Sequence, residues 1–252
     1  MDRAPVDREL VAELIGAAVD AVPHPFVITD YETVLFVNSH ACALQGVETP
    51  EPLIGQPVAK FAHPDMFDAM AQRAPLIMEK RQALRDVPTK YIAADGAVVS
   101  GVSHLIPIEF DGRTCLLWVS KGAAPASRHS TTRIGSAVDS EQLARVFEAL
   151  PDPMLLHDEH HILAANAACR HLLGATSSEA IVGLPVESIV HPDGHAAGEA
   201  RRSLIAHGRF DELNGVAVKL VRLDGRQVRI RVDAHVISAN GRRAFLVTAR
   251  MT

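Results

Sequence analysis

Cysteine and histidine are the residues of this chain best suited to metal, redox or nucleophilic chemistry. The sequence holds three cysteines and thirteen histidines. No Gly-x-Ser-x-Gly, His-Glu-x-x-His or phosphate-binding glycine loop occurs, so the sequence predicts no catalytic activity. The cysteines stand far apart without a Cys-x-x-Cys motif, which excludes a zinc knuckle and a disulfide framework and fits a reducing cytosol. They are Cys42, Cys115 and Cys169.

The densest group of histidines is His157, His160 and His161. These three flank a predicted hairpin turn, and side chains alternate between the two faces of a strand. We therefore expect them to be exposed turn residues rather than ligands of one metal ion. His63 and His191 each open a His-Pro-Asp step. That step is typical of a helix start, because proline suits the first helical turn.

The composition is that of an ordinary soluble globular protein. The chain has 252 residues, 48% of them hydrophobic, and a formal net charge of −5. This mild acidity argues against a nucleic-acid partner, which needs a clustered basic surface. The first residues predict no signal peptide, and no apolar run approaches the roughly 18 residues of a membrane span. We therefore expect a cytoplasmic protein without a membrane partner.

The elements that position these side chains occur twice. Residues 21–65 recur without a gap as residues 149–193, and about a third of the aligned positions are identical. Chance does not produce such a match, so the chain contains a duplicated domain. A small, polar, aperiodic stretch separates the copies. The expected divisions are an amphipathic helix (1–22), a first domain (23–121), a linker (122–139) and a second domain with its own leading helix (140–252).

Each copy follows a predicted amphipathic helix. Apolar residues recur at spacings of three and four over residues 7–22 and again over 141–150. Such stripes suit helix–helix packing, so we expect them to support a homodimer. The side chains expected in this interface are Leu10, Leu14, Ile15 and Val19 in the first helix, and Leu143, Val146 and Phe147 in the second.

Both copies predict two strands, then helices, then three strands. Asn38 is expected to cap a short helix at 39–44, and Pro75 to bend or divide a longer one that begins near His63. Asp-Gly or Asn-Gly pairs predict tight turns between the last three strands of each copy. The expected strands are 25–30, 34–38, 87–93, 98–109 and 114–120 in the first copy, and 154–157, 162–165, 215–223, 227–237 and 243–250 in the second.

Taken together, the two copies resemble PAS domains. The resemblance implies an α+β fold of two tandem domains, each a five-stranded antiparallel sheet with helices on one face and a leading amphipathic helix. It also implies sensing of a ligand or protein–protein contact rather than catalysis. It rests on Pro25 and Pro153 at the first strand, Asn38 and Asn166 before the short helix, Leu-x-Gly at 44–46 and 172–174, Gly-x-Pro-Val at 55–58 and 183–186, and the two His-Pro-Asp triplets.

The resemblance places a ligand in the cavity between sheet and helices. We expect one domain to retain a pocket for a small apolar or amphipathic molecule, and the other mainly to serve assembly. No output domain is recognisable after the second copy, so the signal is expected to pass to a separate protein partner, or to an effector removed by truncation. The pocket candidates are Met66, Phe67, Met70, Tyr91, Leu117 and Trp118 in the first domain, and His195, Leu204, Phe210, Arg229 and Phe245 in the second.

We expect no bound cofactor, with haem as the alternative. The resemblance to haem-binding PAS domains places the iron ligand near Ala197, and His195 is the only serious candidate for it. Two residues correspond to a rotation of about 200° on a helix, so His195 is expected to point elsewhere. Flavin is disfavoured, because light-sensing relatives carry Asn-Cys-Arg-Phe where this chain reads Lys60-Phe-Ala-His and Ser188-Ile-Val-His.

A second alternative is a metalloenzyme built from tandem βαβββ units. That fold needs paired histidine and glutamate ligands on strands of both halves. His104 and Glu109 lie on one predicted strand, but their equivalents are Asp233 and Ser238, so the symmetric ligand set is missing. The fold also expects one helix after the first strand, whereas the helices here are predicted after the second.

Overall fold

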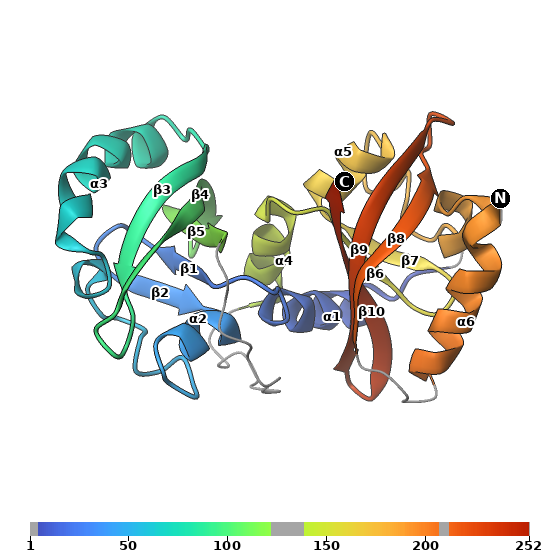
Figure 1. Cartoon of the computed structure of the whole chain (residues 1–252), viewed down its shortest axis with the longest axis horizontal. Coiled ribbons are helices and arrows are strands. Elements are labelled where there is room, and N and C mark those ends of the chain that lie inside the picture. Colours follow the sequence, from blue (N-terminus) through green and yellow to red (C-terminus); the bar gives the residue numbers. More distant parts are fainter. Residues whose placement is uncertain (1–4, 122–138, 207–211, 252) are drawn as a thin grey trace. The chain divides into compact units, whose positions relative to one another are not determined.

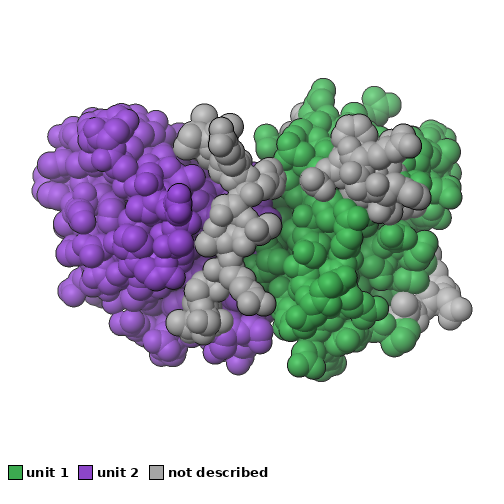
Figure 2. All heavy atoms as spheres, turned by 90° about the horizontal axis from the view of Figure 1, so that it is seen from below, with its two compact units in different colours: residues 1–18, 147–252 green, residues 19–146 purple. Residues whose placement is uncertain are grey.

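The computed structural model describes residues 5–121, 139–206 and 212–251. The expected linker at 122–139 therefore lies almost wholly outside the described residues. Contacts divide the chain into two compact units, residues 1–18 with 147–252, and residues 19–146 (Figure 2). Each unit contains one five-stranded antiparallel sheet with helices, so the predicted α+β fold of two similar domains is confirmed.

The first sheet has the strand order β2-β1-β5-β4-β3, and all neighbouring strands are antiparallel (Figure 1). Helices come between β2 and β3, as the sequence predicts. The bounds are β1 (Phe26–Thr29), β2 (Val34–Val37), α2 (Ser39–Leu44), α3 (Phe67–Ala74), β3 (Leu84–Ile92), β4 (Val98–Phe110) and β5 (Arg113–Lys121).

The second sheet repeats this topology in the order β7-β6-β10-β9-β8 (Figure 1). The predicted bounds of its first two strands agree with the structure, and its third strand begins three residues earlier than expected. The bounds are β6 (Met154–His157), β7 (Ile162–Ala165), α5 (Ala167–Leu173), α6 (His195–Ala206), β8 (Glu212–Val221), β9 (Gln227–Ala239) and β10 (Arg242–Met251).

A fully buried asparagine, Asn38, joins three segments of the first domain. Its Oδ1 accepts hydrogen bonds from Ala41 N at 3.0 Å, which caps α2, and from Phe26 N at 3.1 Å, at the start of β1. Its Nδ2 donates to the carbonyl oxygen of His24 at 2.9 Å. The predicted cap is confirmed, and the same side chain also holds the segment that precedes β1.

Asn166 makes the same bonds in the second domain. Its Oδ1 accepts from Cys169 N and from Met154 N, both at 2.9 Å, and its Nδ2 donates to the carbonyl oxygen of Asp152 at 2.8 Å. An amide is suited to this place because it offers an acceptor and two donors on one planar group. This requirement accounts for the identity of the two residues in the repeat.

Turn pairs close the last hairpins in two ways. Asp111-Gly112 and Asn240-Gly241 have positive φ at both residues, 52° and 70° in the first pair and 48° and 74° in the second. Positive φ at both central residues is typical of a type I′ turn. At Asp95-Gly96 and Asp224-Gly225 only the glycines have positive φ, 81° and 79°. All four predicted turns are confirmed, but the pairing of the strands decides their type.

The His-Pro-Asp steps at His63 and His191 begin helical turns, as predicted. In each step, histidine Nδ1 accepts a hydrogen bond from the aspartate N–H, at 3.2 Å in the first domain and 3.3 Å in the second. In the first domain α3 then ends at Ala74, because Pro75 has no N–H for the next helical bond. A wider π-helical turn follows at Pro75–Glu79. Pro75 thus divides the helix.

The leading helices are α1 (Arg8–Asp20) and α4 (Ser140–Ala149), and their apolar stripes are buried within the single chain. The exposed fraction is 1% for Leu14 and 0% for Val19 and Val146. Leu10 is half-buried. Burial of the stripes leaves little of their surface for a second chain, and the homodimer stays a prediction. The other buried members are Ile15, Leu143 and Phe147.

The last residue of α1, Asp20, is tied to the first residue of α2. Asp20 Oδ1 accepts a hydrogen bond from Ser39 N at 2.9 Å, and Ser39 Oγ donates to the backbone oxygen of Asp20 at 3.1 Å. Burial raises the pKa of the Asp20 carboxyl to about 6, and the bonds from Ser39 offset part of this rise. The folded state therefore binds a proton at Asp20 more tightly than the unfolded state does.

The substitution Asn38→Ala is expected to destabilise the first domain by about 2–4 kcal/mol, because a helix cap is lost and buried backbone groups are left unpaired. Urea denaturation followed by circular dichroism measures the change. The neighbouring Ser39→Ala, which removes one peripheral hydrogen bond, serves as the control. An equal loss in both variants would contradict the role of Asn38 in joining the three segments.

The substitution Asp20→Asn is expected to stabilise the protein at pH 8 and to lose this advantage as the pH falls from about 6 to 4. Above pH 6 the folded wild type carries a buried carboxylate, whereas the amide is neutral and can still accept from Ser39 N. Chemical denaturation at pH 8, 6 and 4 measures the difference, with the exposed Asp68→Asn as control. A difference that does not change with pH would contradict burial as the cause.

Candidate functional site

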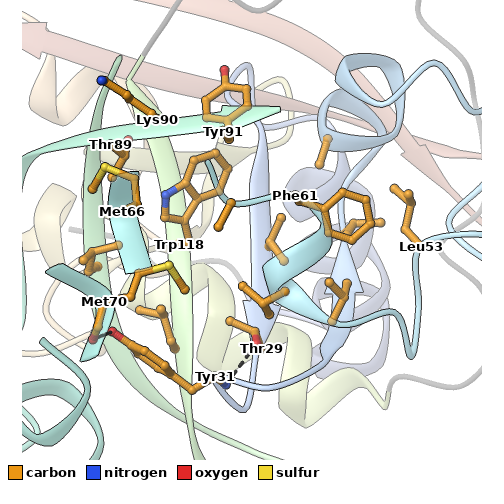
Figure 3. Close-up of a pocket in the computed structure, with 18 of the residues that line it drawn as sticks. Thr29, Tyr31, Leu53, Phe61, Met66, Met70, Thr89, Lys90, Tyr91 and Trp118 are labelled. Carbon is orange, nitrogen blue, oxygen red and sulfur yellow. Dashed lines mark hydrogen bonds between the residues drawn. The ribbon is translucent and has the colours of Figure 1, made fainter. Parts of the chain in front are cut away.

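The first domain contains a cavity of about 140 Å³, partly open to solvent, between its sheet and the helices that follow β2 (Figure 3). All five strands, α2 and α3 contribute to its walls. Apolar side chains dominate these walls, and methionine and aromatic residues supply the largest of them. The larger residues at the cavity are Tyr31, Phe61, Met66, Met70, Tyr91 and Trp118.

Alternation along β5 decides which of its residues reach the cavity. Leu116 and Trp118 line it, whereas Leu117 between them belongs to the opposite face of the sheet, where it is fully buried. The Trp118 ring meets the Tyr91 ring edge-on, with the centroids 5.5 Å apart and the planes at 83°. Trp118 and Tyr91 therefore form one rigid aromatic wall (Figure 3).

The helical wall is formed by Met66 and Met70, which point toward the aromatic wall (Figure 3). They are four residues apart and thus lie on nearly the same side of the helical turns. Phe67 is rotated by about 100° from Met66. It is 43% exposed and does not line the cavity. Of the six candidates in the first domain, Met66, Met70, Tyr91 and Trp118 lie together and Phe67 and Leu117 lie elsewhere.

Tyr31 connects the β1–β2 turn to α3. Its backbone has a φ of 81°, a conformation that L-residues with large side chains rarely adopt. The hydroxyl donates a hydrogen bond to the backbone oxygen of Met70 at 3.0 Å. Burial raises the pKa of the Tyr31 phenol, and the nearby Arg73 guanidinium lowers it by a smaller amount. At the aligned place the second domain has Glu159, and no positive φ.

Three other polar side chains at this cavity are engaged within the protein. Lys90 Nζ pairs with Asp65 Oδ2 at 2.9 Å, and Gln45 Nε2 donates to the backbone oxygen of Ile92 at 3.1 Å. The hydroxyl of Thr89 shares a hydrogen bond of 2.7 Å with another hydroxyl. These groups shape the walls but offer few free bonds to a guest.

The second domain holds a cavity of the same volume, about 140 Å³, in the same place. Leucine, isoleucine and valine form most of its wall. Phe245 lines it and stacks on His157, with the ring centroids 4.9 Å apart and an interplanar angle of 15°. Because no methionine lines this cavity, its walls are stiffer than those of the first.

Two further candidates of the second domain, His195 and Arg229, lie apart from its cavity. His195 Nε2 is 2.9 Å from the backbone oxygen of Val190 and 3.1 Å from that of Glu187, and His195 does not line the cavity. Arg229 is exposed on β9 and also lies outside it. The side chain of Leu204 and the whole of Phe210 lie outside the described residues.

An arginine pair, Arg73 and Arg201, was missed by the sequence analysis. Arg73 lines the first cavity and Arg201 lines the second, and both are half-buried. They occupy aligned positions, because the ungapped register of the repeat continues from the His-Pro-Asp triplets along the helix. The identity of the two residues beyond the aligned 21–65 stretch was the signal that could have found them.

The residues present do not fit haem. The imidazole Nε2 of His195, the only serious candidate ligand, faces backbone oxygens instead of the cavity. A cavity of about 140 Å³ is also close to the volume that holds a benzene molecule and is far from that of a porphyrin.

Metal-binding groups are also dispersed. His104 and Glu109 stand five residues apart on β4, an odd separation that puts them on opposite faces of the sheet. Glu109 pairs with Arg81. Among residues 5–121, 139–206 and 212–251, no group of three or more histidine, cysteine, aspartate or glutamate side chains could hold a metal ion.

The three thiols are buried and stay protonated near neutral pH. Burial raises the pKa of Cys42 and of Cys169 to about 12, and that of Cys115 to about 11. Since the thiolate is the nucleophile, these cysteines are poorly reactive in the folded protein. Cys169 lines the second cavity as a small apolar group.

No helix in the described part of the chain is long and apolar enough to span a membrane.

Three solved structures are similar to parts of the chain. The PAS domain of a protein from Desulfitobacterium hafniense is 18% identical, covering 42% of this chain and 96% of that one, with a TM-score of 0.36. The PAS domain of an HTR-like protein from Haloarcula marismortui is 22% identical, covering 44% and 89%, with a TM-score of 0.38.

A domain of the sensory box sensor histidine kinase/response regulator from Geobacter sulfurreducens is 23% identical, covering 44% of this chain and 92% of that one, with a TM-score of 0.36. No curated protein matches the chain. The family model described as PAS domain matches residues 13–77 and 141–205, about half of the chain. PAS domains are sensory and signalling modules and are typically not enzymes. The chain thus belongs to the PAS family and carries two PAS domains.

Proposed function

We propose that this protein is a sensor whose first PAS domain binds a small, largely apolar molecule, and that its output is contact with a separate signalling protein. The observation that carries the proposal is the cavity between the Trp118–Tyr91 wall and the Met66–Met70 wall.

The size of the cavity indicates the size of the ligand. Its volume of about 140 Å³ is close to that of an engineered protein cavity of roughly 150 Å³ that stays dry and binds benzene. Protein interiors are packed to about the density of organic crystals, so a void of this size is not a usual packing defect. A single aromatic ring with a small substituent, or a short branched alkane, has suitable dimensions.

The chemistry of the walls supports the same ligand class. Trp118 and Tyr91 present ring surfaces, and a ring-shaped guest can meet them offset or edge-on. Met66 and Met70 have unbranched, polarisable side chains that can change rotamer around guests of different outline. The polar side chains Lys90, Gln45 and Thr89 are already bonded within the protein.

Tyr31 supplies a path by which occupancy could affect the surface of the domain. Its ring lines the cavity, and its hydroxyl holds the backbone of α3 at Met70. A guest that displaces the Tyr31 ring or the Met70 side chain therefore acts on α3, which is followed by the π-helical turn Pro75–Glu79. A positive φ at Tyr31 keeps the turn in a conformation that can relax when this contact is lost.

Filling the first cavity by Met70→Trp is expected to abolish binding to the first domain of toluene, which we use as the probe. In the wild type, toluene at ten times its Kd is expected to stabilise the domain by about 1.4 kcal/mol, a shift of several degrees in Tm. Thermal unfolding with and without toluene measures the shift.

The matched control is Phe67→Trp, which makes a similar change on the same helix at an exposed position outside the cavity. This variant should respond to toluene as the wild type does. If the wild type shows no shift with toluene or with a short branched alcohol, or if Met70→Trp responds as strongly as the wild type, the first cavity is not a ligand site of this kind.

Removing the hydroxyl in Tyr31→Phe is expected to lower the stability of the first domain by about 1 kcal/mol and to speed amide exchange in α3, because the bond to the Met70 backbone is lost. Hydrogen exchange followed by mass spectrometry measures this effect. Tyr91→Phe, which alters the other tyrosine of the chain, should leave exchange in α3 unchanged. Equal exchange in Tyr31→Phe and the wild type would rule out the Tyr31 contact as the path to α3.

A further inference from the structure

The two cavities differ in almost every large side chain, but each has an arginine at the same place. Arg73 comes from α3 and Arg201 from α6, at aligned positions of the repeat. Nearby positions have diverged freely, and Met70, which lines the first cavity, is replaced by Gly198, which lines the second. The arginine is thus the common polar feature of two otherwise different cavities.

Arg73 and Arg201 differ from the other partly buried arginines in their charge partners. In the part of the chain that the structure describes, no carboxylate forms an ion pair with Arg73 or Arg201. Other partly buried arginines of the chain do have one. Arg170, whose side chain is 18% exposed, pairs with Glu148, and Arg222, which is 28% exposed, pairs with Asp224 at 3.2 Å. A half-buried arginine beside an apolar cavity and without a carboxylate is therefore unusual in the described part of this molecule.

Two observations connect these charges with the cavities. The Arg73 guanidinium is close enough to the Tyr31 phenol, a wall of the first cavity, to act on its ionisation. In the second cavity His157 Nδ1 is engaged with the backbone oxygen of Asp158. Arg201 is accordingly the charged side chain in the wall of the second cavity that can interact with a guest.

We propose that both PAS cavities take small monocarboxylic acids, with the apolar body of the acid in the cavity and its carboxylate on Arg73 in the first domain and Arg201 in the second. For the first cavity this inference rests on the proposed function and names the class of ligand. For the second cavity it adds a binding site. An aromatic acid of one ring has a body that suits about 140 Å³.

The physical chemistry of the pair supports this assignment. Guanidinium and carboxylate can form two parallel hydrogen bonds, which fix the orientation of the acid as well as its charge. Because both arginines are half-buried, they keep part of their hydration, and the desolvation penalty is smaller than for a fully buried ion pair. The acid would also remove the one uncompensated charge at each cavity wall.

An arginine can also line a cavity through its alkyl stem alone, with the charge left to solvent. The substitution Arg→Met separates these roles, because methionine keeps an unbranched apolar stem and removes the charge. The test compares benzoate with benzamide, its neutral analogue of nearly the same shape, by isothermal titration calorimetry on the full chain.

The wild type is expected to bind two benzoate molecules per chain, at least about tenfold more tightly than benzamide at low salt, and the preference should shrink as salt is added. Arg73→Met and Arg201→Met should each reduce the benzoate stoichiometry from two to one, and the double variant should show no preference for benzoate. Arg229→Met, an exposed arginine outside both cavities, should behave as the wild type.

Equal affinities of the wild type for benzoate and benzamide would overturn the inference, and this measurement needs no variant. Retention of two benzoate sites in the double variant would do the same. If toluene still stabilises the first domain in either case, the proposed function stands and only the carboxylate assignment fails. If the wild type binds none of the three probes, both fail.

Discussion

The hydrogen bonds of one buried amide hold the frame of each PAS domain together. Asn38 and Asn166 each accept from the first residue of a strand and from the first turn of a short helix, and donate to the chain that precedes the strand. A buried polar group is tolerated only when its partners are all present, so these segments must come together as one unit. The sheet and its helices take their relative positions from this point.

The cavity follows from the order of the elements. Helices inserted between the second and third strands must cross the sheet to reach the far edge, and side chains from both sides meet between the layers. In the first domain aromatic residues on the sheet face methionines on the helical side, and the packing leaves about 140 Å³ empty. In the second domain shorter aliphatic side chains, with glycine at the place of Met70, leave the same volume. One frame thus encloses two interiors of similar size and different shape.

Duplication separates the residues that maintain the frame from those that adapt the interior. Turn glycines, the capping asparagines and the prolines at 23, 25, 57 and 64 have remained identical in the two copies, because each meets a backbone requirement that few other residue types meet as well. The walls of the cavities carry no such requirement and have diverged. Arg73 and Arg201 combine the two behaviours, since they are identical in type and yet lie on the walls. A residue that forms an ion pair with a ligand in both domains is expected to show this combination.

The sequence by itself determined the duplication, the α+β order of elements, the caps at Asn38 and Asn166 and the positions of the hairpin turns. The duplication is visible in the sequence itself. The elements, caps and turns depend mainly on contacts between residues close in the chain, so local residue types are enough to predict them. Only the tertiary structure decided which side chains reach a cavity. Met66 and Met70 do and Phe67 does not, because one residue on a helix is a rotation of about 100° and apolar character alone does not tell which direction is buried. The same holds for Leu117 and Trp118 on opposite faces of β5, and for Arg73 and Arg201, whose position beside an apolar cavity depends on elements distant in the chain.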